Sequence, residues 1–167
     1  MAELKIKYSS SSAITITLAS LATSADRTAG RESTVIDNSS TLYDDVLVGG
    51  VITTGTTPTV SKQIDIYVYA AVNDTPTYPD VFAGTDSAET VTSVNVRASA
   101  LRLLASIVVD ATSDRAYWLA PTPVAQLFGG IMPRYWGVFV AHDTAVNLNA
   151  TGGNHVLSMT GISWTSA

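Results

Sequence analysis

The chain has 167 residues, enough for one well-buried core and few for two domains. Its net charge is −5, and its nine lysines and arginines are scattered singly, without the basic cluster that nucleic-acid binding requires. The apolar stretches are far shorter than the roughly 20 residues of a membrane-spanning helix, so we expect neither nucleic acid nor a membrane as a partner.

Charged residues make up 14% of the chain, well below the roughly 25% of an average soluble domain. Cysteine is absent, which excludes disulfides and thiolate metal sites. A surface with so little charge has to be covered by serine, threonine, asparagine and glycine, or hidden against other subunits. The composition therefore favours a component of an assembly over a freely diffusing monomer.

The N-terminal segments alternate between apolar and polar residues, which is the period of a β-strand. Residues 4–8 (LKIKY) and 13–18 (AITITL) show this alternation, and the polar serines between them predict a hairpin. Residues 19–41 are polar and contain glycine, so we expect a long loop there. Loops of that length are usually functional or packed on a neighbour, and we expect contact with a neighbouring subunit.

The middle of the chain contains the clearest strand, at residues 64–72 (IDIYVYAAV). Its even-numbered residues face one way, and Asp65, Tyr67 and Tyr69 face the other. Residues 42–54 predict a strand interrupted by a bulge or bend at Gly49 and Gly50. Residues 90–96 predict a short strand. Residues 101–109 have some helical spacing, but their alternation and their Ile-Val-Val ending favour a strand.

Four further apolar segments, at 116–119, 124–128, 135–142 and 155–164, are separated by proline- and glycine-containing turns. Closely spaced strands without intervening helices predict an all-β fold. We expect a single antiparallel β-sandwich or jelly-roll-like domain over residues 1–167, with little helix beyond one turn. The predicted core residues are Ile14, Ile16, Ile66, Val68, Ile107, Val138, Val140 and Ile162.

Candidates for a metal or acid–base site are few. His142 and Asp143 with His155 form one group, but zinc needs three or four converging ligands and these residues lie on different predicted strands. His142 shares a face with Trp136, so we interpret it as a hydrogen-bonded sheet residue. Asp44 and Asp45 lack the spacing of a calcium loop and indicate a solvated strand edge. We therefore expect no metal and no cofactor.

Catalytic patterns are equally weak. No serine lies in a Gly-x-Ser-x-Gly elbow, and the three glutamates each occur in a polar stretch, so we predict no catalytic residues and no enzyme. The adjacent Arg31 and Glu32 suggest local or intersubunit ion pairs. Several aromatic residues could stack on sugar rings, although core or interface roles are favoured for them. They are Tyr67, Tyr69, Tyr78, Trp118, Tyr135, Trp136 and Trp164.

Three stretches carry a resemblance to a known group of proteins. They are residues 7–42 (KYSSSSAITITLASLATSADRTAGRESTVIDNSSTLY), 126–138 (QLFGGIMPRYWGV) and 147–155 (NLNATGGNH). The chain resembles small structural proteins encoded among the virion genes of tailed double-stranded-DNA bacteriophages, in order and along nearly its whole length. The resemblance includes no catalytic motif, so no catalytic residue is carried over.

The resemblance implies a non-catalytic virion protein that is assembled in the host cytoplasm. Capsid decoration, or cement, is the role that a compact, acidic, Ser/Thr-rich β-domain fits best, with the major capsid protein or another virion protein as its partner. We expect a homo-oligomer, and a trimer in particular. The alternative is a tail, baseplate or head-fibre component that binds host-surface glycan, and a depolymerase ranks third.

Overall fold

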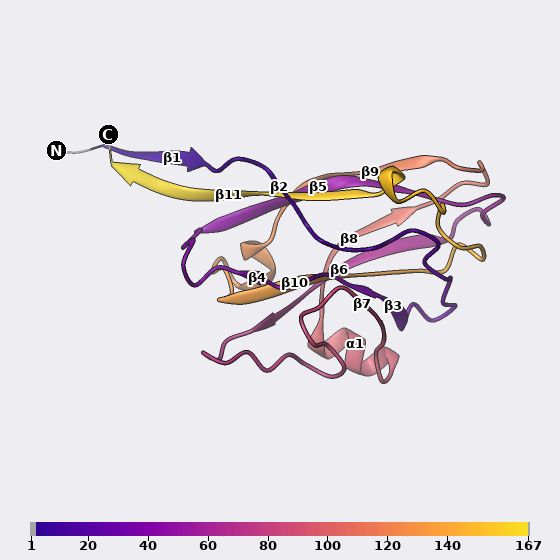
Figure 1. Ribbon diagram of the computed structural model, residues 1–167, viewed down its shortest axis with the longest axis horizontal. Helices are drawn as coiled ribbons and strands as arrows, with labels where there is room; N and C mark the ends of the chain where they lie inside the picture. Colours follow the sequence, from indigo (N-terminus) through magenta and orange to yellow (C-terminus); the bar gives the residue numbers. More distant parts are fainter. Residues whose placement is uncertain (1–2, 167) are drawn as a thin grey trace.

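The computed structural model describes residues 3–166 and consists mainly of two antiparallel β-sheets packed face to face (Figure 1). Sheet A has the order β1-β11-β5-β9, with β2 beside β11. Its strands are β1 (Leu4–Tyr8), β2 (Ser12–Ala13), β5 (Asp45–Thr53), β9 (Ala116–Pro123) and β11 (Val156–Ser166). Sheet B has the order β7-β3-β10-β6-β8, with β4 beside β10. The predicted antiparallel sandwich is confirmed.

The strands of sheet B are β3 (Ala29–Glu32), β4 (Ile36–Asp37), β6 (Gln63–Ala71), β7 (Ser87–Thr90), β8 (Arg102–Val108) and β10 (Tyr135–His142). Helical structure within residues 3–166 is limited to α1 (Val94–Ala100), η1 (Ala125–Phe128) and η2 (Gly152–Asn154). The predicted strand over 124–128 is wrong, because most of this segment forms η1. Gly129 ends that turn with a left-handed conformation at φ 74°, which glycine adopts without strain.

The core between the sheets is built from the inward-facing residues of β5, β6, β10 and β11. Of the predicted core residues, five are buried there: Ile14, Ile66, Val68, Val138 and Val140. Ile16 and Ile107 are half-buried and pack against the same cluster. Ile162 is wrongly predicted as a core residue. It lies opposite Asp45 on the face of β11 that points away from sheet B, and it is half-buried.

Sheet B is covered on its outer face as well, on the side to which Asp65, Tyr67 and Tyr69 point. Tyr67, Tyr69 and Phe139 form a second buried cluster under residues 78–101. The ring of Phe82 stacks on that of Tyr69, with centroids 4.6 Å apart. The chain therefore forms a third layer, including α1, beneath sheet B (Figure 1).

Helix α1 also corrects the strand predicted at residues 90–96. The side chain of Ser93 accepts a hydrogen bond from the backbone N–H of Val96, which is the usual N-cap contact. Leu101, which follows the helix, is buried in the second cluster. Local capping and this apolar anchor outweigh the modest strand preference of the short valine-containing segment.

The predicted N-terminal hairpin does not form. β1 pairs with the end of β11 instead, from Leu4 opposite Ser166 to Tyr8 opposite Ile162. Only the short β2 follows the serine turn, and it also pairs with β11. Alternation predicts that a segment is a strand, but the partner is decided by contacts distant in sequence.

Residues 19–41 are not one long loop, because they contain β3 and β4, which pair with β10. The turn before β3 is tied to the body by an ionic cluster around Arg27. Arg27 Nε lies 2.7 Å from Asp65 Oδ2, and Arg27 Nη1 donates to Asp143 Oδ2 at 2.8 Å. The segment thus packs on its own sandwich, which corrects the expected loop.

The interruption predicted at Gly49 and Gly50 is confirmed as a register shift between β5 and β9. Gly50 has a φ of 153°, a conformation that other residues rarely adopt. A Cβ at this position would lie 2.0 Å from the carbonyl oxygen of Val156. Glycine is therefore required for β11 to approach β5 at the bulge.

Candidate functional site

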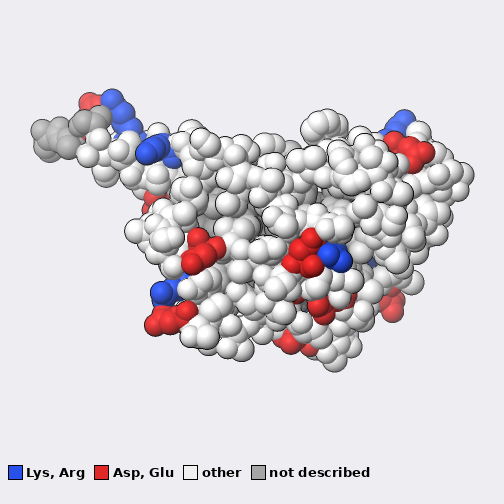
Figure 2. Space-filling model, in the orientation of Figure 1, with Lys and Arg blue, Asp and Glu red and all other residues white. Residues whose placement is uncertain are grey.

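The outer face of sheet A is not covered by a further layer of the described residues 3–166. It carries few charged side chains, and we call it the bare face. Its residues are Leu4, Ile6, Tyr8, Leu47, Gly49, Val51, Trp118, Val156, Ser158, Thr160, Ile162 and Trp164. Asp45, opposite Ile162, is half-buried and accepts a hydrogen bond from the N–H of Ala125. In Figure 2 the upper edge of the body is correspondingly white between its two ends.

One end of the bare face is a two-stranded ribbon that projects beyond the body (Figures 1 and 2). It consists of β1 and the last residues of β11, and every residue of β1 is exposed. Its two faces differ in character. Leu4, Ile6, Tyr8 and Trp164 lie on the bare face, whereas Lys5 and Lys7 lie on the other. An isolated two-stranded ribbon is marginally stable in water, so a partner on its apolar face would stabilise it.

The other end of the bare face is a shallow hollow beside Trp118. It has a volume of about 380 Å³ and is lined by Gly49, Gly50, Leu119, Pro121 and neighbouring residues. The side chain of Trp118 is 76% exposed and lies at its margin. Ser11, Ser158 and Thr160 add hydroxyl groups to the lining. Gly49 contributes to the hollow, because it lies on this face and places no side chain above the sheet.

A second uncovered apolar surface lies where β6 ends and β10 begins, and we call it the end patch. Leu42, Val72 and Ile131 are 71%, 81% and 74% exposed. They border two adjoining hollows of about 300 and 530 Å³ that share Met132 and Arg134. Exposed residues of this size in one cluster are typical of interaction surfaces.

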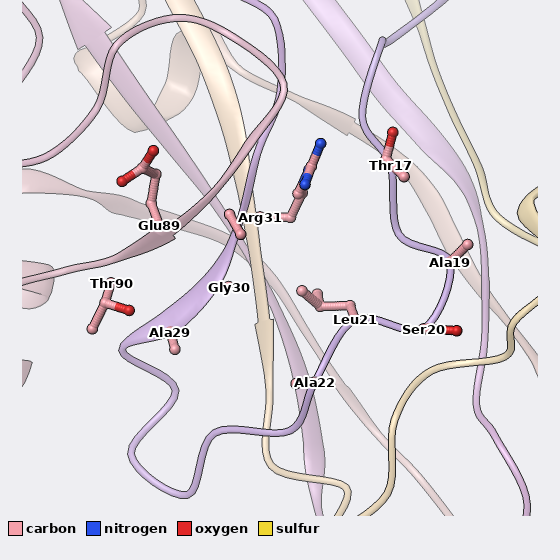
Figure 3. A pocket seen from close by; sticks show the side chains of 11 residues that line it. Thr17, Ala19, Ser20, Leu21, Ala22, Ala29, Gly30, Arg31, Glu89 and Thr90 are labelled. Atoms are coloured by element: carbon pink, nitrogen blue, oxygen red, sulfur yellow. The ribbon is translucent and has the colours of Figure 1, made fainter.

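A cleft of about 310 Å³ opens between residues 17–22 and the edge formed by β3 and β7 (Figure 3). Its lining is dominated by small residues, with Leu21, Arg31 and Glu89 as the larger ones. Arg31 is already paired with Asp86, from its Nε to Oδ1 at 2.6 Å. Glu89 accepts a hydrogen bond from Ser87. Both charged groups therefore already have partners within the fold.

The two histidines have separate environments. His142 is fully buried, with its Nδ1 2.9 Å from the hydroxyl of Thr144 and its Nε2 3.0 Å from the carbonyl oxygen of Leu21. His155 contacts the carbonyl oxygen of Asn149 through Nε2, at 2.8 Å. Within residues 3–166, no group of three or more potential ligands is placed to hold a metal ion. His142 is a hydrogen-bonded sheet residue, as its shared face with Trp136 indicates.

Burial lowers the pKa of His142 below its ordinary value of 6.5, although the carbonyl of Leu21 and Asp143 oppose this shift. The unfolded chain therefore takes up this proton first as the pH falls. The contribution of neutral His142 to the free energy of unfolding is fully present above about pH 6.5. It is lost as the pH decreases, by at most about 1.4 kcal/mol per pH unit. Urea unfolding at about pH 7.5 and about pH 5.5 should show this loss. His142→Gln should lose less between the two values, and an equal loss would contradict the assignment.

The acidic candidates serve the fold. Asp45 accepts hydrogen bonds from the backbone N–H of its neighbour Val46 and from that of Ala125 at the start of η1, whereas Asp44 is exposed. Asp45 lies in an interior strand of sheet A, so the predicted solvated edge is wrong for it. Glu32 is fully buried and does not pair with Arg31. Its carboxylate accepts hydrogen bonds from Ala83, Gly84 and Ser87, which holds the third layer against sheet B.

Only two of the aromatic candidates are substantially exposed, and both lie on the bare face. Trp118 is 76% and Trp164 is 57% exposed. Tyr67, Tyr69 and Trp136 are buried. The remaining two, Tyr78 and Tyr135, are half-buried. The structure thus separates the set, whose members have similar patterns in the sequence, into core residues and surface residues.

Sequence reasoning missed the bare face as a unit. A usable signal was present in residues 156–164, where Val156, Ile162 and Trp164 alternate with the inward-facing Leu157 and Met159. Comparisons of the chain with protein families, curated proteins and solved structures found no match. Among the described residues, no helix has the length and apolar character to cross a membrane.

Proposed function

We propose that this protein is a non-catalytic structural component of a tailed-bacteriophage virion, specifically a capsid decoration protein that binds neighbouring subunits of the shell. The observation that carries the proposal is the presence of two uncovered apolar surfaces, the bare face and the end patch. Both lie on one β-sandwich that has two buried hydrophobic clusters. A protein that bridges two partners needs two such surfaces. The resemblance of residues 7–42, 126–138 and 147–155 to phage virion proteins supports the setting.

The physical role follows from the load on a filled capsid. Packaged DNA presses on the shell from within, so additional interface across the seams between capsomers resists separation. Interfaces of about 1,200–2,000 Å² in total, repeated over many copies, supply that resistance without any single tight contact. The protein would be assembled into virions in the host cytoplasm, with the major capsid protein as its partner at the end patch.

The first test concerns particles that carry this protein. Deleting its gene, or stripping the protein from particles, should lower the temperature at which DNA is released. A reconstruction of the virion should show many copies ringing the capsid. Stripped particles that retain DNA as well as intact ones but no longer adsorb to cells would overturn the decoration role.

The end patch provides a sharper version of this test. Ile131→Asp places a charge in the patch and should reduce the number of copies per particle. Val60→Asp makes the same change at a residue that is 59% exposed and lies before β6, at the end of the strand away from the patch, and should leave occupancy unchanged. Equal occupancy for both variants would exclude the end patch as the shell-binding surface.

One observation favours the second candidate, glycan binding by a tail, baseplate or head-fibre component. Trp118 presents an exposed ring beside a hollow that also carries the hydroxyls of Ser158 and Thr160. An aromatic platform with nearby hydroxyls is suited to stacking and hydrogen bonding with a sugar. Titration of the isolated protein with host-surface glycans, followed by tryptophan fluorescence, distinguishes this function. Binding that is lost in Trp118→Ala would support it.

A further inference from the structure

We propose that the bare face packs against the bare face of a second copy, forming a two-fold symmetric dimer in which the ribbon of each copy covers the Trp118 hollow of the other. This inference names the partner of one surface and goes beyond the proposed function, because such a dimer forms whether or not the protein is located on a capsid.

The chain covers one outer sheet face and leaves the other open. On sheet B, residues 78–101 bury Tyr67, Tyr69 and Phe139. On sheet A, Leu4, Ile6, Tyr8, Trp118, Val156 and Trp164 are all between 44% and 76% exposed. Soluble monomers rarely expose a contiguous apolar surface of this extent. Association that buries these side chains would therefore be favoured by the hydrophobic effect.

The charge of the face selects the partner. Each copy has a net charge of −5, yet among residues 3–166 the one acidic side chain on this side of sheet A, that of Asp45, is half-buried and hydrogen-bonded. Two copies can thus meet on this face without bringing acidic groups into direct opposition. A strongly basic partner would find no complementary charge there. The chemistry of the face matches an equally uncharged, apolar surface, and the face itself is such a surface.

The area is adequate for a stable dimer. With strands about 4.8 Å apart and a rise of about 3.4 Å per residue, the ribbon and the body of sheet A present roughly 500 Å² in projection. Protruding side chains such as Trp118 and Trp164 raise the accessible area above that projection. Stable interfaces bury about 800 Å² on each partner, so nearly the whole bare face would be used.

The side chain of Trp164 and the hollow beside Trp118 lie at opposite ends of the face. Trp164 is on the ribbon, and the hollow lies beside Ser158, ~20 Å away along β11. A two-fold axis crossing the strands near Gly161 places Trp164 of each copy over the hollow of the other. The same rotation places Ile6 over the neighbourhood of Ser158 and β2. Both contacts occur twice, as an isologous interface requires.

The oligomeric state of the purified chain tests the interface. Sedimentation equilibrium should show a dimer, and Trp164→Asp should weaken dimerisation at least about tenfold, because it places a charge on the aromatic anchor that fills the hollow of the partner copy. Thr165→Asp is the matched control, since it makes a similar change one residue away on the opposite face of the ribbon. A monomer at about 1 mM, a trimer, or equal effects of the two variants would overturn the proposal.

Cross-linking tests the register, and the absence of native cysteine makes it specific. A chain with Ser158→Cys is mixed with a chain with Ile6→Cys and treated with a short bismaleimide. Cross-links should join unlike chains, because two copies of either cysteine lie ~20 Å apart along the strands in the proposed dimer. Links between like chains only would overturn this arrangement. Dimerisation is measured on isolated protein and DNA retention on particles, so failure of one proposal is distinguishable from failure of the other.

Discussion

Trp136→Ala should reduce the free energy of unfolding by about 3–5 kcal/mol, the range for truncating a large aromatic side chain in a packed core. Trp136 is fully buried on β10, where it lies opposite Ala70 of β6 and Ile36 of β4. The substitution leaves a cavity in the core between the two sheets. Because whole domains have about 5–15 kcal/mol of stability, this change removes a large share of it. Urea unfolding followed by far-UV circular dichroism measures the loss.

Trp136→Phe is the matched control, because it retains most of the buried ring. The indole Nε1 of Trp136 has no hydrogen-bond partner among the described residues, so the substitution also removes an unsatisfied buried donor. The loss should therefore be much smaller than for alanine. If both variants unfold at the same urea concentration as the wild type, the packing between the two sheets around β10 is not as described.

Arg27→Ala should cost about 3 kcal/mol or more, because it leaves the nearly buried carboxylate of Asp65 without a cation and that of Asp143 with only Lys62, at 3.7 Å. The side chains of Asp65 and Asp143 are only 5% and 9% exposed, and both pair with Arg27. Burial alone lowers the pKa of Arg27, but the two carboxylates outweigh it and the pKa is raised. The guanidinium is thus held in its charged form. Thermal and urea unfolding of the purified variant measure the effect.

Two controls separate the ionic cluster from ordinary surface pairs. Arg115→Ala removes the partner of Asp110, but both side chains there are more than 40% exposed, so the loss should stay below about 1 kcal/mol. Arg27→Lys keeps a cation and should lose less stability than Arg27→Ala. If Arg27→Ala is as stable as Arg115→Ala, the segment before β3 is not anchored by this cluster.

The local pattern of the sequence determines which residues form strands and which side chains share a face. The alternation in residues 64–72 and 135–142 correctly places Ile66, Val68, Val138 and Val140 on one side, because successive side chains of any strand point in opposite directions. The interruption of a strand by glycine is also determined by the local sequence. Gly49 and Gly50 predict the bulge, since it requires a backbone conformation that other residues avoid.

Only the tertiary structure decides which strands pair and which sheet faces are covered. Leu4–Tyr8 has the same alternation whether it pairs with the following segment or with β11, because the energy that selects the partner comes from residues distant in sequence. Tyr67 and Trp118 are both aromatic residues in strands, yet one is buried under the third layer and the other is exposed. Which outer face stays bare depends on where residues 78–101 pack, and that choice has no local signature.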